Sequence, residues 1–280
     1  CGMNAPRRSG SRRARGRSPA GLTQMPWTDM TMGYAPLEIV TEEQVEAIHA
    51  TSLRILSELG IRVASQRVMD LFTAAGASVD RDSGTVRIDA DLVDHALSTT
   101  PGTVTLTPRN PDHTVRIGGN SVVFGLVAGP PNVHDRINGR RTGNMADYEN
   151  FIRLAHHFNA IQIIGNQVTA PMELPANTRH LDTYLANLRL ADHAFHVSAI
   201  GRGRVMDGIE MMAIARGVTM DDMRDRPGVT TIISVNSPRL FDTEMAEGLI
   251  AMAEHGQPVS VTPFTLMGAM TPVTLPAAMA

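Results

Sequence analysis

SVVFGLVA, residues 121–128, is an apolar run with the length and composition of a strand that is buried on both faces. Four comparable runs follow it, separated by stretches with the apolar spacing of amphipathic helices. Strands that alternate with helices in this way predict a parallel sheet with right-handed crossovers. The predicted strands are residues 122–128, 161–168, 195–200, 229–235 and 258–262, and the predicted helices are residues 144–158, 178–191, 205–216 and 242–254.

The spacing of these units favours a closed barrel. Five units occupy residues 121–280 at about 32 residues per unit, so eight would need about 250 residues, the usual length of a (β/α)8 TIM-type barrel. An open doubly wound sheet is the alternative, but no turn carries its Gly-x-Gly-x-x-Gly pattern. We therefore predict an α/β fold with a partial barrel, truncated inside a fifth helix that Thr271 and Pro272 open. Its first and fifth strands would be open edges, so we expect the isolated chain to aggregate.

The sequence before these units has a different pattern of apolar residues and predicts a small α+β region over residues 31–120. Residues 41–60 have a helical pattern, which Thr41 and Gln44 open as a capping box. The arginine, serine and glycine of residues 1–30 predict a disordered tail. Short strands are expected within residues 79–88, 103–107 and 114–117.

Composition excludes several kinds of chemistry. The only cysteine is Cys1, which argues against disulfides and multi-thiolate metal sites, and all 25 basic residues are arginine, which excludes Schiff-base lysines and P-loops. Aromatic residues make up 4% of the chain, too few for a nucleic-acid stacking platform. His193 and His196 are three residues apart in a predicted strand and would not share a face, so no metal ligands are assigned. No apolar run is long enough to span a membrane, and we expect a cytoplasmic homo-oligomer.

Neutral polar residues follow the predicted strands. Active sites of parallel barrels lie at the carboxyl ends of the strands, so these residues are the candidates for a ligand site. The second-tier candidates are less specific, because an aspartate in such a loop can simply cap a turn. We assign substrate binding to Asn132, Asn166, Asn236, Thr262 and Phe264, with His134, Asp135 and Phe241 as second-tier candidates.

Three stretches together resemble the trimethylamine methyltransferase family. LEIVTEEQVEAIHATSLRILSELGIRVAS (residues 37–65) is similar to the leading helix of that family, and GPPNVHDRINGRRTGNMADYENFIRLAHHFNAI (residues 129–161) to its first strand-end loop and helix. GQPVSVTPFTLMGAMTPVTLPAAMA (residues 256–280) resembles its Gly-Ala-x-x-Pro-Val-Thr-Leu segment and is the most specific of the three. Pro276 departs from the alanine more common there and would remove a hydrogen bond from the expected fifth helix.

The resemblance implies a barrel that transfers a methyl group from a tertiary or quaternary methylamine, such as trimethylamine or glycine betaine, to a Co(I) corrinoid. That corrinoid would be carried by a partner protein, so no cofactor is expected to bind this chain directly. Some members of the family use pyrrolysine, whose equivalent position would fall beyond Ala280. A quaternary ammonium has no proton to remove, so neutral dipoles, aromatic rings and a countercharge suffice to bind it.

The sequence leaves two alternative functions open. A metal-dependent barrel lyase or aldolase is disfavoured, because no predicted strand end offers a cluster of carboxylates and histidines. An inactive, truncated remnant of such a barrel is the other alternative.

Overall fold

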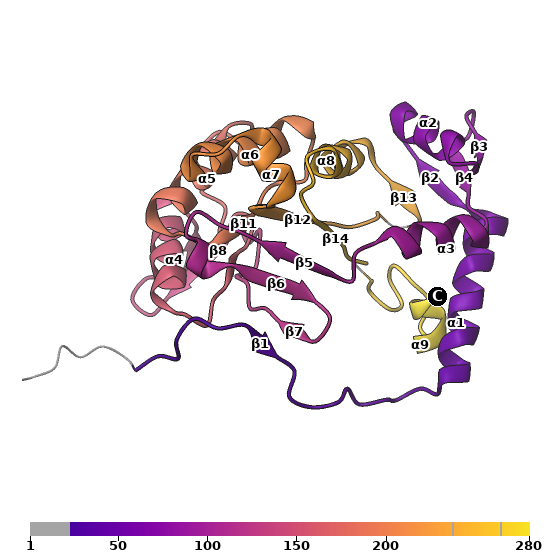
Figure 1. The fold of residues 1–280 in the computed structure, drawn as a ribbon, viewed down its shortest axis with the longest axis horizontal. Helices are drawn as coiled ribbons and strands as arrows, with labels where there is room; N and C mark the ends of the chain where they lie inside the picture. The colour runs from indigo at the N-terminus through magenta and orange to yellow at the C-terminus, as the bar shows by residue number, and fades with distance from the viewer. Residues whose placement is uncertain (1–22, 237, 264) are drawn as a thin grey trace, which may run out of the picture.

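A parallel sheet lies at the centre of the computed structural model, which describes residues 23–236, 238–263 and 265–280 (Figure 1). Its four strands have the order β10-β11-β12-β14, and every neighbouring pair is parallel. The parallel pairing of four predicted strands is therefore confirmed, although the observed strands are shorter. Their bounds are Ile163–Ile164 (β10), Ala194–His196 (β11), Val229–Ile233 (β12) and Val259–Val261 (β14).

The predicted helices between these strands are also present, and they pack in series as α4 on α5, α5 on α6 and α6 on α8 (Figure 1). The main core lies between them and the sheet, with Tyr148, Phe195, Ile209 and Met212 fully buried. A further short helix, α7, follows α6 and was not predicted. The helix bounds are Met145–His157 (α4), Arg179–Leu190 (α5), Arg202–Arg216 (α6), Met220–Asp225 (α7) and Thr243–Glu254 (α8).

The first predicted strand forms only in part. β7 (Ser121–Val122) pairs antiparallel with β1 (Met30–Thr31), and beyond it a single parallel bridge joins Gly125 to Ile163. The prediction of a regular buried strand over residues 122–128 is therefore wrong. Phe124 and Val127 are 52% and 78% exposed, so the apolar run is not covered on both faces.

The segment before β7 contains both helices and short strands. The capping box of Thr41 and Gln44 opens α1, a short π-helical turn (η1) ends it, and the hairpin strands pair antiparallel. One link was not foreseen: β13, between β12 and α8, adds to the small sheet in the order β13-β2-β4-β3. The bounds are Glu42–Arg54 (α1), Ile55–Leu59 (η1), Ile61–Val63 (β2), Gln66–Ala74 (α2), Ser78–Asp80 (β3), Thr85–Arg87 (β4), Ala90–Thr99 (α3), Thr103–Leu106 (β5), Pro111–His113 (η2), Val115–Gly118 (β6) and Leu240–Phe241 (β13).

Two features correct expectations for the loops. The loop after residue 129 contains a hairpin of β8 (Asn132–Asp135) and β9 (Gly139–Thr142). The last helix, α9 (Leu275–Met279), lies beside α1 and starts later than Thr271, so Pro276 falls in its first turn (Figure 1). Proline costs no hydrogen bond there, because the first amides of a helix have no partner within the helix.

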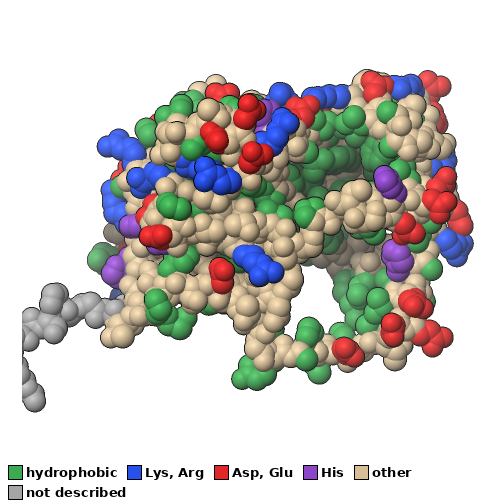
Figure 2. Space-filling view, viewed as in Figure 1, with side chains coloured by type: hydrophobic (Ala, Val, Ile, Leu, Met, Phe, Trp, Pro, Cys, Tyr) green, Lys and Arg blue, Asp and Glu red, His purple; other side chains and the backbone are tan. Residues whose placement is uncertain are grey.

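The surface also carries an apolar groove between α2 and α8 (Figure 2). Among the described residues, no helix combines the length and hydropathy that crossing a membrane requires. Of the predicted tail over residues 1–30, residues 1–22 lie outside the described part of the chain.

Candidate functional site

The carboxyl edge, defined here as the edge at which β10, β11, β12 and β14 end, carries three of the predicted binding residues. Asn166 follows β10, Asn236 follows β12, and Thr262 directly follows β14. Because the four strands are parallel, these residues leave the sheet at the same edge. Phe264 lies outside the described residues. Whether the predicted side chains converge on one ligand stays a prediction.

Asn166 is the most informative of these residues. Its side-chain Oδ1 is buried, and no hydrogen-bond partner for it lies among the described residues. The next residue, Gln167, has a φ of 47°, an uncommon backbone conformation for a residue other than glycine. Its carbonyl accepts a hydrogen bond from the backbone of Gly129 at 2.8 Å, which brings the loop before β8 against the end of β10. Strain and an unused acceptor at one point are typical of a binding site.

Asn236 is tied to the start of α8. Its side-chain Nδ2 donates to Oδ2 of Asp242 at 2.7 Å, while Oδ1 of Asp242 caps the helix by accepting from Met245 N. A Cβ atom placed on Gly201, in the loop after β11, would lie 2.6 Å from Oε2 of Glu244. Two carboxylates therefore stand beside the carboxyl edge, at Asp242 and Glu244. The sequence analysis did not assign them, because both look like ordinary helix-start residues.

The only histidine in β11 is electrically neutral at ordinary pH. Burial lowers the pKa of His196 to about 4, because the interior disfavours the charged imidazolium. The first residues after the strands, such as Ser198 and Ser234, are also uncharged. The positive charge of a cationic ligand would therefore meet amide and hydroxyl dipoles, with the carboxylates at the start of α8 beyond them.

The β8–β9 hairpin holds the other predicted residues. Asn132 begins β8 and is half-buried, whereas His134 is exposed. Oδ1 of Asp135 accepts from the backbone amides of Ile137 and Asn138, at 2.8 and 2.7 Å. Asp135 thus caps the turn, which is the role that the sequence analysis named as the alternative to substrate binding.

An ion pair fastens this hairpin to α4. Arg141 donates to both carboxylate oxygens of Asp147, at 2.5 and 2.6 Å, and more weakly to Asp135 at 3.4 Å. The hydrogen bond from Arg141 holds the pKa of Asp147 below its ordinary value. A pocket between the hairpin and α4 is lined by Val133, His134, Asp135, Arg141, Asp147 and Asn150, among others.

Phe241 directly precedes Asp242 in the chain, but its side chain packs on the N-terminal region. It belongs to β13 and pairs with Val63 of β2. Its ring lines the apolar groove between α2 and α8 and packs against the small core of the N-terminal region. A role for Phe241 in substrate binding stays a prediction from the sequence.

We expect Asp135→Ala to open the turn of this hairpin without unfolding the chain, because the side chain is exposed to solvent. Hydrogen bonds from Asn138 lower the pKa of Asp135 from 3.8 to about 2. A lowered pKa means that the carboxylate stabilises the folded turn above pH 3.8, and that this effect is lost as the pH falls toward about 2. A pH titration of the Ile137 and Asn138 amides by NMR measures both effects.

Asp135→Asn is the matched control, since its amide oxygen can still accept from the turn but does not titrate. If the turn amides of the unaltered protein titrate near pH 3.8, the capping role is contradicted.

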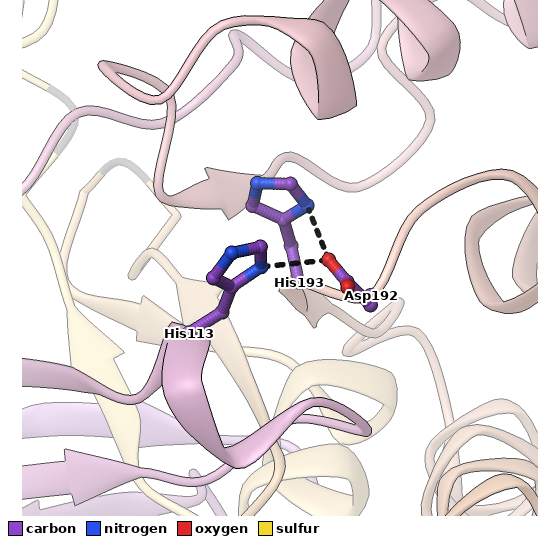
Figure 3. Close-up of side chains that lie close together, drawn as sticks. All are labelled: His113, Asp192 and His193. Atoms are coloured by element: carbon purple, nitrogen blue, oxygen red, sulfur yellow. Dashed lines mark hydrogen bonds and ion pairs between the residues drawn. The ribbon is translucent and has the colours of Figure 1, made fainter. Parts of the chain in front are cut away.

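A second group of polar side chains lies at the opposite, amino end of the sheet. Asp192 and His193 directly precede β11, and they meet His113 at the end of η2 (Figure 3). Nδ1 of His113 lies 2.7 Å from Oδ1 of Asp192. Burial, followed by the nearby His113, lowers the pKa of His193 to about 4. No spacing in the sequence predicts this group, because His113 is far from the other two residues along the chain.

Comparison with known proteins shows which family the chain belongs to. The family model of trimethylamine methyltransferase (MTTB) matches residues 7–280. A glycine betaine methyltransferase of Desulfitobacterium hafniense is 31% identical over 237 residues, covering 85% of this chain and 49% of that protein. A trimethylamine methyltransferase of the same species is 26% identical, over 84% of this chain and 47% of that protein.

A proline betaine:corrinoid methyltransferase of Eubacterium limosum is 24% identical, over 86% of this chain and 49% of that protein. The chain thus spans about half the length of the curated relatives that it matches. The resemblance seen in the sequence is confirmed: this chain belongs to the trimethylamine methyltransferase family.

Proposed function

We propose that the protein transfers a methyl group from a tertiary or quaternary methylamine to the Co(I) corrinoid of a partner protein. Membership of the family supports this function, as do the names of the relatives, which act on glycine betaine, proline betaine and trimethylamine. We further propose that the parallel sheet is part of a (β/α)8 barrel, with residues 31–120 as a preceding α+β region. The serial packing of α4, α5, α6 and α8 agrees with that architecture.

The observation that carries the proposal is the unused Oδ1 of Asn166 at the carboxyl edge. An amide oxygen presents its negative end to a cationic trimethylammonium group without offering a base that could be protonated. Asp242 and Glu244, at the start of α8, would supply a countercharge. A quaternary amine needs no proton transfer, so this uncharged edge with acids nearby suits it.

The reaction requires little acid–base catalysis from the residues of this chain. The methyl carbon forms a bond to Co(I), giving methyl-Co(III), and its bond to nitrogen breaks, so that the electron pair of that bond leaves with the neutral amine. The protein's own residues have to orient the ammonium group and exclude water from the approaching carbon. A quaternary amine, or a tertiary amine bound as its protonated ammonium ion, leaves as a neutral amine, so no residue has to donate or remove a proton.

The partner must reach the carboxyl edge, and the loops at residues 129–144 and 263–271 are the proposed contact surface. Ile137, at the tip of the β8–β9 hairpin, is 91% exposed, and Leu266 and Met267 are about half exposed. Apolar residues at loop tips are typical of a docking surface. The cytoplasmic location and the homo-oligomeric state stay predictions from the sequence.

The test is formation of methyl-Co(III), followed by absorbance, with the full-length protein, a reduced corrinoid protein and a panel of methylated amines. We expect activity with at least one amine of the panel and a loss of about tenfold or more in kcat/KM for Asn166→Ala, because a buried dipole to a charged group is removed. Gln66→Ala, on the exposed start of α2, is the matched control and should keep full activity.

Two outcomes would contradict the proposal. No transfer from any amine of the panel would favour the lyase or the inactive remnant. If Asn166→Ala keeps full activity, then neither Asn166 nor the site built around it binds the substrate.

A further inference from the structure

Four side chains from three distant parts of the chain meet at the amino end of the sheet. Nδ1 atoms of His113, His156 and His193 lie 2.7, 3.4 and 3.7 Å from the same oxygen, Oδ1 of Asp192. We call these four residues the histidine cluster. The ligand atoms of His113, Asp192 and His193 all lie within 4.8 Å of one another. Figure 3 shows the rings of His113 and His193 facing the carboxylate from two sides.

One ring nitrogen of His193 has no hydrogen-bond partner among the described residues. Its side chain is 1% exposed, and its Nδ1 is a buried atom with no hydrogen-bond partner among the described residues. The ring is hydrogen-bonded to the backbone of Ile161, which engages the other ring nitrogen. A histidine that donates through one nitrogen presents a lone pair on the other, and this is the arrangement of most metal-binding histidines.

The lone pair on Nδ1 of His193 therefore points toward a carboxylate oxygen 3.7 Å away. Two acceptors that face each other in a buried place are unfavourable unless a cation lies between them. His113 does not supply a donor to Nδ1 of His193, because its own Nδ1 is already 2.7 Å from the same oxygen of Asp192. The second oxygen of Asp192 accepts from Nδ2 of Asn110 at 3.1 Å, so the carboxylate is held in this orientation.

We propose that the histidine cluster binds a zinc ion through His113, His193 and Oδ1 of Asp192, with His156 beside these three ligands. Two imidazoles and a carboxylate are ligands that zinc accepts in tetrahedral sites. At ordinary zinc–ligand bond lengths, two ligand atoms of a tetrahedron are about 3.3 Å apart. The distance from Asp192 to His193 is close to this value, and His113 would have to move away by only about 0.6 Å.

Zinc in this position would be structural. It lies at the amino end of the sheet, whereas the proposed substrate site lies at the carboxyl edge. It would join η2 of the N-terminal region to the start of β11. Asn110, which orients the carboxylate, acts as a positioning residue.

Trp27 covers the cluster and reports on it. Its ring stacks on His113 with centroids 4.2 Å apart and an interplanar angle of 19°. Neighbouring Gln24 anchors this segment through hydrogen bonds with the backbone of His157 and Asn159. Trp27 is the only tryptophan of the chain, so its fluorescence will respond to an ion bound next to His113.

The experiment removes metal from the purified chain with a chelator, exchanges it into metal-free buffer and titrates it with Zn²⁺. Zinc content is measured by mass spectrometry of the element, and Co²⁺ serves as a spectroscopic substitute. We expect about one zinc ion per chain, intense visible absorption of tetrahedral Co²⁺, and quenching of Trp27 fluorescence by the same ion. Binding should also raise the melting temperature as the concentration of free zinc increases.

Variants separate binding from folding. Asp192→Asn and His193→Gln should lower zinc affinity by about a hundredfold or more, and Asn110→Ala, which removes only a positioning contact, by about tenfold. His95→Asn, on the exposed face of α3, should bind zinc as the unaltered chain does. The Trp27 emission without metal shows whether each variant has folded.

Failure of the folded chain to retain zinc, or an octahedral Co²⁺ spectrum, would overturn the proposal and leave an ordinary hydrogen-bonded cluster. Zinc affinity that is equal in Asn110→Ala, Asp192→Asn and the unaltered chain would overturn it as well, because the ion would then be bound elsewhere.

Discussion

Replacing Phe195 by alanine is expected to lower the free energy of unfolding by about 3–5 kcal/mol, the usual cost of removing a buried phenylalanine ring. Phe195 is 0% exposed and is the middle residue of β11. Its backbone pairs with Ile164 on one side and Val229 on the other, so the residue lies within the sheet. Its ring contacts Tyr184 of α5 at a centroid distance of 5.5 Å. The cavity would therefore open between the sheet and the helices, where strands on both sides limit collapse.

Unfolding in urea, followed by circular dichroism, measures this loss. Phe124→Ala is the matched control, because Phe124 is 52% exposed, and we expect its effect to stay below about 1 kcal/mol. Equal effects of the two substitutions would mean that the packing of β11 against α5 is not the core of the folded chain.

Gln257→Leu should have the second-largest effect, a loss of about 3 kcal/mol or more, because it leaves several buried polar groups without partners. Oε1 of Gln257 accepts from the amides of Gly228 and Val229, at 3.1 and 3.3 Å. Its Nε2 donates to the carbonyls of Met223 and His255, at 2.7 and 2.8 Å. This one side chain thus joins the start of β12 to the end of α7 and to the turn after α8. Leucine is similar in size but can make none of these hydrogen bonds.

Hydrogen exchange gives the local readout for this variant. The amides of Gly228 and Val229 should exchange much faster in Gln257→Leu, while the amides of the β5–β6 hairpin should change less. Gln66→Leu, on the exposed start of α2, is the control and should leave the exchange rates unchanged. Persisting protection at Gly228 and Val229 would show that other groups hold the start of β12.

The elements were largely predictable because their signals are local. Thr41 with Gln44 opens a helix through contacts three residues away, and the structure contains this capping box. The apolar runs at residues 229–235 and 258–262 pair in parallel as predicted. The run at 121–128 led to a wrong prediction for the same reason: its composition is that of a buried strand, but Phe124 and Val127 are 52% and 78% exposed in the described part of the chain.

The candidate site was predictable only as a set of positions. The rule that parallel strands end at one edge assigns Asn166, Asn236 and Thr262 correctly to that edge. It could not show that the Oδ1 atom of Asn166 lacks a partner among the described residues, or that Asp242 contacts Asn236 and Glu244 lies near Gly201. These facts depend on how the start of α8 meets the loops after β11 and β12, which no spacing within one segment encodes.

The sequence by itself determined the family, the order of the four parallel strands with the main helices between them, and the residues that follow those four strands, because each rests on patterns within a few dozen neighbouring residues. Only the tertiary structure decided that β13 joins the N-terminal sheet and that His113 meets Asp192 and His193. His113 and Asp192 are separated by 79 residues along the chain. Their meeting depends on the packing of the N-terminal region against the parallel sheet, a property of the whole fold to which each local stretch contributes only its own surface.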